Sequence, residues 1–491
     1  MKQLKGFEED FKENKEKAET WIESHFEKWK KDLTPMQKEI IEKFADLPEG
    51  YDLNQILKDV GEESTEQLMT LLPNDFENKY DYISDKYYFD EAFNHLSGKI
   101  PNRMFVYQDI NLADLRLNQN DFINSDDSLN ISAFSDLEKY IVYGKNSQYL
   151  EVNVAGMREA KDPTDRIKIR LELPSGTNVV PIKEDTLYLS GGASLSIQEE
   201  FSVITIKNKK YILIQAKYED KKIADDKIIN KQEEFNILYS SIFGLSSNDH
   251  FYKFSLSDKY ASGIVGHAEE ALKKLESPVE FGGVEKELLE IAGKFMLEKK
   301  GEIIFTDRLL GFVPEVQNPD IDVDTVNKHN HAGGITKVSS RTIVINGRAN
   351  IYDNENNLNF YFDYKNLKEY LSHEIGHILD SWLGELIYGK NKLWSENDTS
   401  FNFYYNLLKP RLSEHYFEYA QSSRAEYFAE IFRFIYSDQI YKSESWENPP
   451  EDIEGKKLSD IVQIRVPEIV EHIKDSLTNA KRNKQIDRNS I

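Results

Sequence analysis

Apolar residues recur with a helical period at the start of the chain. Between Phe7 and Trp29 they return at steps of three, four and seven residues among lysines and glutamates, which predicts helices with one buried face. The run Thr34-Pro35-Met36-Gln37 then predicts the start of another helix. It offers a hydroxyl N-cap, proline at the first helical position and glutamine three residues after the cap. We therefore predict a helical N-terminal segment over residues 1–75.

The middle of the chain predicts strands instead. Segments with alternating apolar and polar residues, or with many β-branched and aromatic side chains, lie at 104–110, 166–173, 201–207 and 210–218. Turn-rich pieces separate them. The pattern predicts an α+β domain with an antiparallel or mixed sheet over residues 76–250.

The remaining part, residues 251–491, is predicted to be mainly helical with a small sheet. Its strand candidates lie at 302–307 and 341–347, just before the richest chemistry of the chain. The predicted fold class is thus α+β and multidomain. The length of 491 residues agrees, because a domain usually takes roughly 100 to 200 residues.

Charge and composition exclude several classes of function. The formal net charge of −24 repels phosphate backbones and anionic lipids, so we expect no nucleic-acid partner. Cysteine is absent, so a metal ion would have to bind His, Asp or Glu. No apolar run approaches about 18 residues, and the first residues lack the apolar core of a signal peptide. We therefore predict neither stable membrane insertion nor a signal peptide in this chain.

The segment His373-Glu374-Ile375-Gly376-His377 is an HExxH motif within a helical pattern. Two histidines four residues apart project from one side of a helix, so both imidazoles can bind one Zn²⁺ at about 2.0 to 2.1 Å. Glu374 lies beside them and can act as a general base towards an attacking water. The alternative interpretation is two surface histidines on a helix.

A second helical segment offers further candidates. Glu426 and Glu430 are four residues apart in an otherwise apolar pattern, which suits one carboxylate that binds the metal and one that orients a ligating imidazole. The alternative is two solvated glutamates. Upstream, His415, Tyr416 and Tyr419 could each donate a hydrogen bond to an oxyanion, and each could equally be a packing residue.

These motifs together resemble the anthrax lethal factor family, which consists of zinc metalloprotease toxins of the gluzincin type. The resemblance extends in collinear order over most of the chain after about residue 15. The segments that carry it are YDLNQIL (51–57), KYASGIV (259–265), EIIFTD (302–307), HEIGHILD (373–380) and RAEYFAEIFR (424–433).

The resemblance implies roles for individual residues and one zinc ion per chain. The implied zinc ligands are His373, His377 and Glu426. It further implies Glu374 as the general base, Tyr419 as the catalytic tyrosine, and Glu430 as the carboxylate behind a ligand.

The resemblance also implies that residues 76–250 are similar to an ADP-ribosyltransferase that has lost its chemistry. Gln108 stands where an active transferase carries an arginine after the Val-Tyr of its first strand. The acidic segment 198–200 is out of register with the following strand. This domain is therefore predicted to bind substrate and no cofactor.

The predicted function is a zinc-dependent endopeptidase toxin of bacterial origin, secreted or injected and acting in the host cytosol. The resemblance implies basic host protein or peptide substrates, with the MAP kinase kinases among the candidates. It leaves open a separate translocation or carrier component, because the family's carrier-binding domain has no counterpart here. The alternatives are an NAD-dependent mono-ADP-ribosyltransferase toxin and a catalytically silent binding protein.

Overall fold

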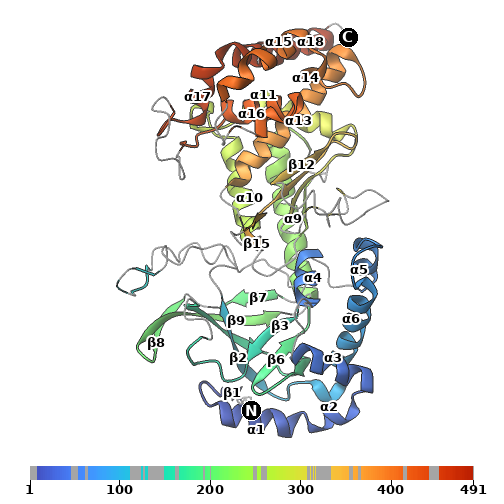
Figure 1. The fold of residues 1–491 in the computed structure, drawn as a ribbon, viewed down its shortest axis with the longest axis vertical. Helices are drawn as coiled ribbons and strands as arrows, with labels where there is room; N and C mark the ends of the chain where they lie inside the picture. Colours follow the sequence, from blue (N-terminus) through green and yellow to red (C-terminus); the bar gives the residue numbers. More distant parts are fainter. Residues whose placement is uncertain are drawn as a thin grey trace.

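The chain is arranged as two lobes joined by a long helix, α9 (Lys221–Phe243). In Figure 1, one lobe holds the large sheet and the N-terminal helices, and the other holds the C-terminal helices. The computed structural model describes residues 8–45, 53–60, 65–110, 123–124, 126, 128–130, 149–160, 165–191, 194–198, 201–219, 221–246, 252–255, 262–306, 310, 313, 316, 333–352, 358–362, 366–412, 417, 419–441 and 453–489.

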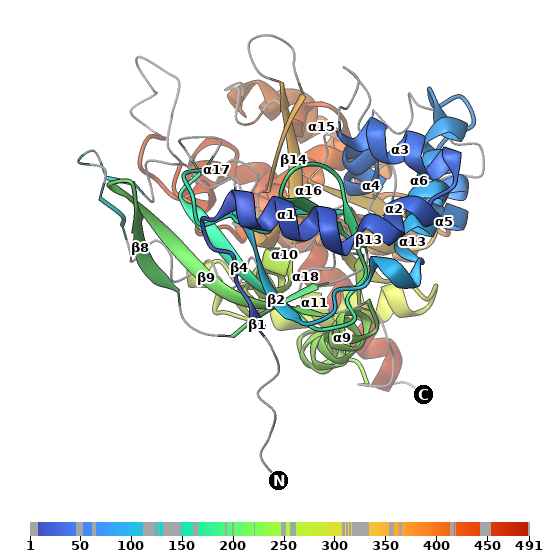
Figure 2. The ribbon, with the colours of Figure 1, turned by 90° about the horizontal axis from the view of Figure 1, so that it is seen from below.

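Short helices form the N-terminal segment, as predicted. They are α1 (Lys15–His25), α2 (Glu27–Asp32), α3 (Pro35–Ala45), α4 (Leu53–Val60) and α5 (Thr65–Leu71). The predicted capping box is present, because Thr34 N donates to Gln37 Oε1 at 2.8 Å and Gln37 N donates to Thr34 Oγ1 at 3.3 Å. Figure 2 shows α1 and α2 crossing the end of the molecule that faces away from the C-terminal helices.

The prediction of helix is wrong at Glu8–Glu9, which form the short strand β1 parallel to β2 (Arg103–Ile110). The following Asp10 accepts hydrogen bonds from Tyr107 Oη at 2.6 Å and Arg170 Nη2 at 2.7 Å. Burial raises the pKa of Asp10, but these two bonds outweigh it and hold the pKa below its ordinary value. Long-range contacts thus decide the conformation of residues 8–10.

The large sheet is mixed and confirms the predicted strands at 104–110, 166–173, 201–207 and 210–218. Its order is β5-β6-β3-β2-β4-β9-β7, with β1 on β2 and β8 on β9, and β4 and β9 are parallel. The remaining strands of this sheet are β3 (Leu150–Asn153), β4 (Ile167–Leu173), β5 (Val179–Pro181), β6 (Thr186–Leu189), β7 (Ser194–Ile197), β8 (Ser202–Ile206) and β9 (Lys209–Glu219). Helix α6 (Lys79–Phe93) packs beside α3 and α5.

A four-stranded sheet of order β10-β11-β13-β12 lies in the C-terminal lobe. Its strands are β10 (Tyr252–Ser255), β11 (Ile303–Thr306), β12 (Gly334–Lys337) and β13 (Thr342–Asn346), and a separate hairpin is formed by β14 (Arg348–Tyr352) and β15 (Leu358–Phe362). Strands β11 and β13 confirm the two predicted strands. Strand β12 lies at one edge and pairs with β13 in antiparallel fashion.

Helices make up most of this lobe. They are α10 (Ser262–Leu275), α11 (Lys286–Leu297), α13 (Leu367–Tyr388), α14 (Trp394–Asn397), α15 (Thr399–Leu408), α16 (Arg424–Ile435), α17 (Leu458–Arg465) and α18 (Pro467–Asn489). The predicted α+β, multidomain fold class is confirmed. The boundaries predicted near residues 75 and 250 stay predictions.

Helices α13 and α16 approach each other closely because small residues face each other at their crossing. A Cβ atom on Gly376 would lie 2.9 Å from Ala429 Cα, so no larger side chain fits there without a shift. The apolar stripe of α13, including Leu371, Ile378 and Leu379, is buried beneath it. The crossing brings the HExxH motif to the acidic face of α16.

None of the helices in the described part of the chain is long and apolar enough to cross a membrane.

Candidate metal centre

Three side chains from α13 and α16 point their donor atoms at one another. His373 Nε2 lies 3.1 Å from His377 Nε2 and 3.1 Å from Glu426 Oε2. His377 Nε2 lies 3.4 Å from the same Glu426 oxygen. Among the described residues, this is the one group of three such side chains close enough to share a metal ion. The structure thus brings together the three predicted ligands.

The size of this triangle fits zinc. Two donors that bind one ion at about 2.0 to 2.1 Å with a tetrahedral angle between them lie about 3.3 Å apart. The three observed distances, from 3.1 to 3.4 Å, are close to that spacing. Two imidazole nitrogens and one carboxylate oxygen are also a donor set typical of catalytic zinc. The residues present therefore fit the ion without rearrangement.

The charges of the cluster favour a bound cation. Burial raises the pKa of Glu426, but hydrogen bonds and charge interactions with His373 and His377 outweigh it and hold the pKa far below its ordinary value. Burial lowers the pKa of His373, but Glu426 and Glu430 outweigh it and raise the pKa to about 10. The Glu426 carboxylate is thus ionised, as a metal ligand must be, and a bound metal ion would take the place of the proton on His373.

Glu430 lies behind His373, on the side away from the triangle. Its Oε1 is 2.7 Å from His373 Nδ1, an ion-pair contact whose angle falls outside that of a regular hydrogen bond. Its Oε2 accepts a hydrogen bond from Arg433 Nη2 at 2.6 Å. Burial raises the pKa of Glu430, but the charge of Arg433 and the contact with His373 outweigh it and lower the pKa to about 2. This ionised carboxylate can orient the His373 ring.

We expect Glu430→Leu to weaken zinc affinity by about 10- to 100-fold without abolishing binding, because the His373 ring loses the group that orients it. A metal-competition titration measures this. Glu430→Gln, which keeps an acceptor for His373 Nδ1, is the matched control and should lose less. Equal zinc affinity in wild type and Glu430→Leu would contradict the orienting role.

Glu374 and Tyr419 both lie near His373. Glu374 is 4% exposed, and its Oε2 accepts a hydrogen bond from Thr336 Oγ1 at 2.6 Å.

Tyr419 begins a short 3₁₀ helix and is 58% exposed. Its ring centroid lies 5.9 Å from that of His373. Partial desolvation of the phenol and then the charges of Glu426 and Glu374 raise the pKa of Tyr419, so the phenol is a proton donor at neutral pH. The other two oxyanion candidates, His415 and Tyr416, lie outside the described residues.

Two contacts at this centre were not predicted from the sequence. Arg433 follows Glu430 by three residues, and this helical spacing could have revealed the pair. Thr336 precedes Glu374 by 38 residues and belongs to another element, so no local pattern indicated it.

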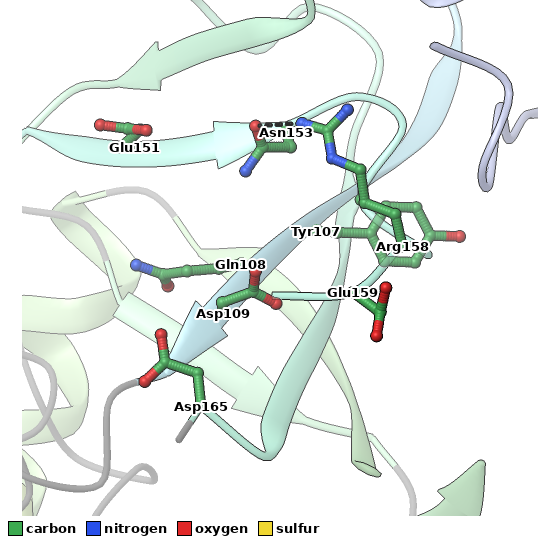
Figure 3. Close-up of a pocket in the computed structure, with 9 residues that line it drawn as sticks. Tyr107, Gln108, Asp109, Glu151, Asn153, Arg158, Glu159 and Asp165 are labelled. Atoms are coloured by element: carbon green, nitrogen blue, oxygen red, sulfur yellow. Dashed lines mark hydrogen bonds between the residues drawn. The ribbon is translucent and has the colours of Figure 1, made fainter. Parts of the chain in front are cut away.

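The middle domain contains a separate polar pocket of about 180 Å³ beside Gln108 (Figure 3). Four carboxylates line it, from Asp109, Glu151, Glu159 and Asp165. Arg158 is the one cationic side chain among its described lining residues. That guanidinium already binds Asp185 Oδ1 at 3.1 Å and Asn153 Oδ1 at 3.2 Å. Such a lining disfavours the pyrophosphate of NAD. Residues 199 and 200 of the acidic segment lie outside the described part.

Known proteins resemble this chain in sequence. The family model of the anthrax toxin lethal factor middle domain matches residues 11–219. Lethal factor of Bacillus anthracis is 25% identical over 405 residues, which cover 82% of this chain. The chain is lethal factor-like. It spans about half of that relative, since the match covers 46% of lethal factor.

Solved structures of bacterial toxins, among them the ADP-ribosyltransferase toxin Plx2a, share a partial likeness with this chain. Plx2a from Paenibacillus larvae is 17% identical with a TM-score of 0.34, covering 43% of this chain and 98% of its own. The C2-I component of the Clostridium botulinum C2-toxin is 14% identical with a TM-score of 0.37. The match covers 55% of this chain and 67% of C2-I. Nothing about the activity of this chain follows from likenesses of this size.

Proposed function

We propose that the chain is a zinc-dependent endopeptidase toxin similar to lethal factor. One observation carries the proposal: the donor atoms of His373, His377 and Glu426 form a triangle of the size expected for a tetrahedral zinc ion, and Glu374 follows His373 on the same helix. The similarity to lethal factor over 82% of the chain supports a toxin of that kind.

The roles of the side chains follow from their positions. His373, His377 and Glu426 would hold one zinc ion. When bound, zinc supplies a Lewis acid that polarises the scissile carbonyl and makes a water molecule more acidic. The Glu374 carboxylate takes a proton from the attacking water and passes it to the leaving amine. The Tyr419 phenol donates a hydrogen bond to the carbonyl oxygen as negative charge develops on it.

The same proposal includes the roles of the three predicted domains and the class of substrate. Residues 251–491 would be the catalytic domain, residues 76–250 would bind substrate, and residues 1–75 would complete the binding surface. A net charge of −24 favours basic peptide segments of host proteins, with the MAP kinase kinases as candidates. A secreted or injected effector of this kind would act in the host cytosol, and a separate carrier would be one route of entry.

Metal analysis combined with a cleavage assay tests the proposal. The purified protein should contain about one zinc ion per chain, and it should cut a small set of proteins in a host-cell lysate, as detected by sequencing new N-termini. Chelation should stop cleavage, and added zinc should restore it. A protein that binds no zinc under metal-replete conditions, and transfers label from radioactive NAD instead, would contradict the proposal and favour the transferase.

A further inference from the structure

A side-chain hydroxyl of strand β12 contacts the proposed general base, Glu374. Thr336 Oγ1 donates to Glu374 Oε2 at 2.6 Å, and the same oxygen lies 3.2 Å from the backbone carbonyl oxygen of Glu374. A hydroxyl has one proton, and distances of about 2.5 to 2.7 Å are typical of charge-assisted O–H···O⁻ bonds. The carboxylate contact is therefore the stronger of the two.

The sheet holds this hydroxyl in place. Gly334 pairs with Ile345 and Thr336 pairs with Ile343 in the antiparallel ladder between β12 and β13. Alternate residues of a strand share one face, so 334 and 336 face α13 while Ile335 packs on the opposite side in a small apolar cluster. The β-branched side chain of threonine also has restricted χ1 freedom. The donor thus has little freedom to turn away from Glu374.

Gly334 leaves room for the other carboxylate oxygen, Glu374 Oε1. A Cβ atom at this position would lie 2.7 Å from Glu374 Oε1 and 3.0 Å from Glu374 Cγ, closer than real side chains allow. Any larger residue at 334 would therefore push the carboxylate aside. Strand β12 therefore contacts the two oxygens in different ways. It binds Oε2 through the Thr336 hydroxyl, and next to Oε1 it carries a glycine, which adds no side chain.

We propose that Thr336 is a positioning residue for Glu374: its hydroxyl binds Oε2 and so presents Oε1 as the oxygen that accepts the proton during catalysis. The inference rests on the proposed proteolytic function. The terminal torsion of a glutamate has a broad and roughly two-fold preference, so a single strong donor is enough to select one orientation. A base held in its reactive orientation avoids the cost of reorienting during the reaction.

Paired substitutions at one position isolate the hydroxyl. Thr336→Val keeps the shape of the side chain and removes the donor, whereas Thr336→Ser keeps the donor. With a peptide substrate identified by the cleavage assay, we expect Thr336→Val to keep its zinc and its KM while kcat falls by about 10- to 100-fold. Thr336→Ser should keep most of the wild-type kcat. Thr342→Val, which removes a hydroxyl from the neighbouring strand β13, is the matched control and should keep kcat unchanged.

A readout without activity separates this inference from the proposed function. In crystal structures of the metal-free protein, Glu374 should have one carboxylate orientation in the wild type and in Thr336→Ser, and a rotated or split orientation in Thr336→Val. If the wild type cleaves nothing, the proteolytic function fails, while a rotated Glu374 in Thr336→Val still supports the positioning contact. Wild-type kcat together with an unmoved Glu374 in Thr336→Val would overturn the inference. So would a Thr336→Ser variant as slow as Thr336→Val.

Discussion

Replacing Glu374 by glutamine is expected to remove proteolysis while leaving about one zinc ion bound to each chain. A glutamine side chain has the same shape, and its amide oxygen can still accept the hydrogen bond from Thr336 Oγ1. It cannot take a proton from the attacking water, and loss of a general base costs about 100- to 10,000-fold in rate. Single-turnover cleavage of an identified substrate, with metal analysis of the same sample, measures both quantities.

The histidines give the contrasting result. His373→Ala or His377→Ala should lose both zinc and proteolysis, because each removes one corner of the donor triangle. The comparison separates a residue that holds the metal from one that moves a proton. Wild-type turnover by Glu374→Gln would show that another group is the base, and zinc retention by both alanine variants would show that the ion binds elsewhere.

Tyr419→Phe is expected to fold and bind zinc normally but to lose about 100- to 1,000-fold in kcat. The lost phenol is a donor needed only when negative charge develops on the carbonyl oxygen, and removal of one such donor costs about 2.7 to 4 kcal/mol. The ring stays, so its contact with the His373 ring at 5.9 Å should persist. The loss should appear in kcat more than in KM, because the bond is weak in the ground state.

The neighbouring candidates provide the control for Tyr419. If Tyr419→Phe keeps near wild-type turnover while Tyr416→Phe or His415→Ala loses it, the oxyanion donor is one of those residues. Zinc content must be measured for all three variants, because His415 could also affect the metal. Circular dichroism and thermal melting of each variant exclude a loss of fold as the cause.

The crossing of α13 and α16 explains how side chains from two helices come together at one centre. Gly376 lies between the two histidines of the triangle, and its missing side chain allows the backbone of α16 at Ala429 to approach. Glu426 and Glu430 then reach the two nitrogens of the same imidazole from opposite sides. Arg433 holds the second of these carboxylates. A ligand set held in this way needs little reorganisation to bind a cation.

Part of the candidate site could be predicted from the sequence because it depends on spacing within single elements. The separation of His373 and His377 makes them neighbours on any helix, whatever surrounds it. The capping box between Thr34 and Gln37 is equally local, and it formed as predicted. The alternating patterns that predicted β2, β4, β8 and β9 likewise need only the two faces of a strand.

Contacts between distant elements were decided by the tertiary structure alone. Glu426 lies 53 residues after His373, and from the residues alone it could equally be a solvated glutamate. The packing of α16 against α13 brings it to His373. Thr336 reaches Glu374 across 38 residues, and β1 forms because Asp10 meets Tyr107 and Arg170. The physical reason is the same in each case. The period of a helix or a strand determines which of its own residues share a face. Which other element packs against that face depends on the tertiary structure, and the local sequence pattern does not indicate it.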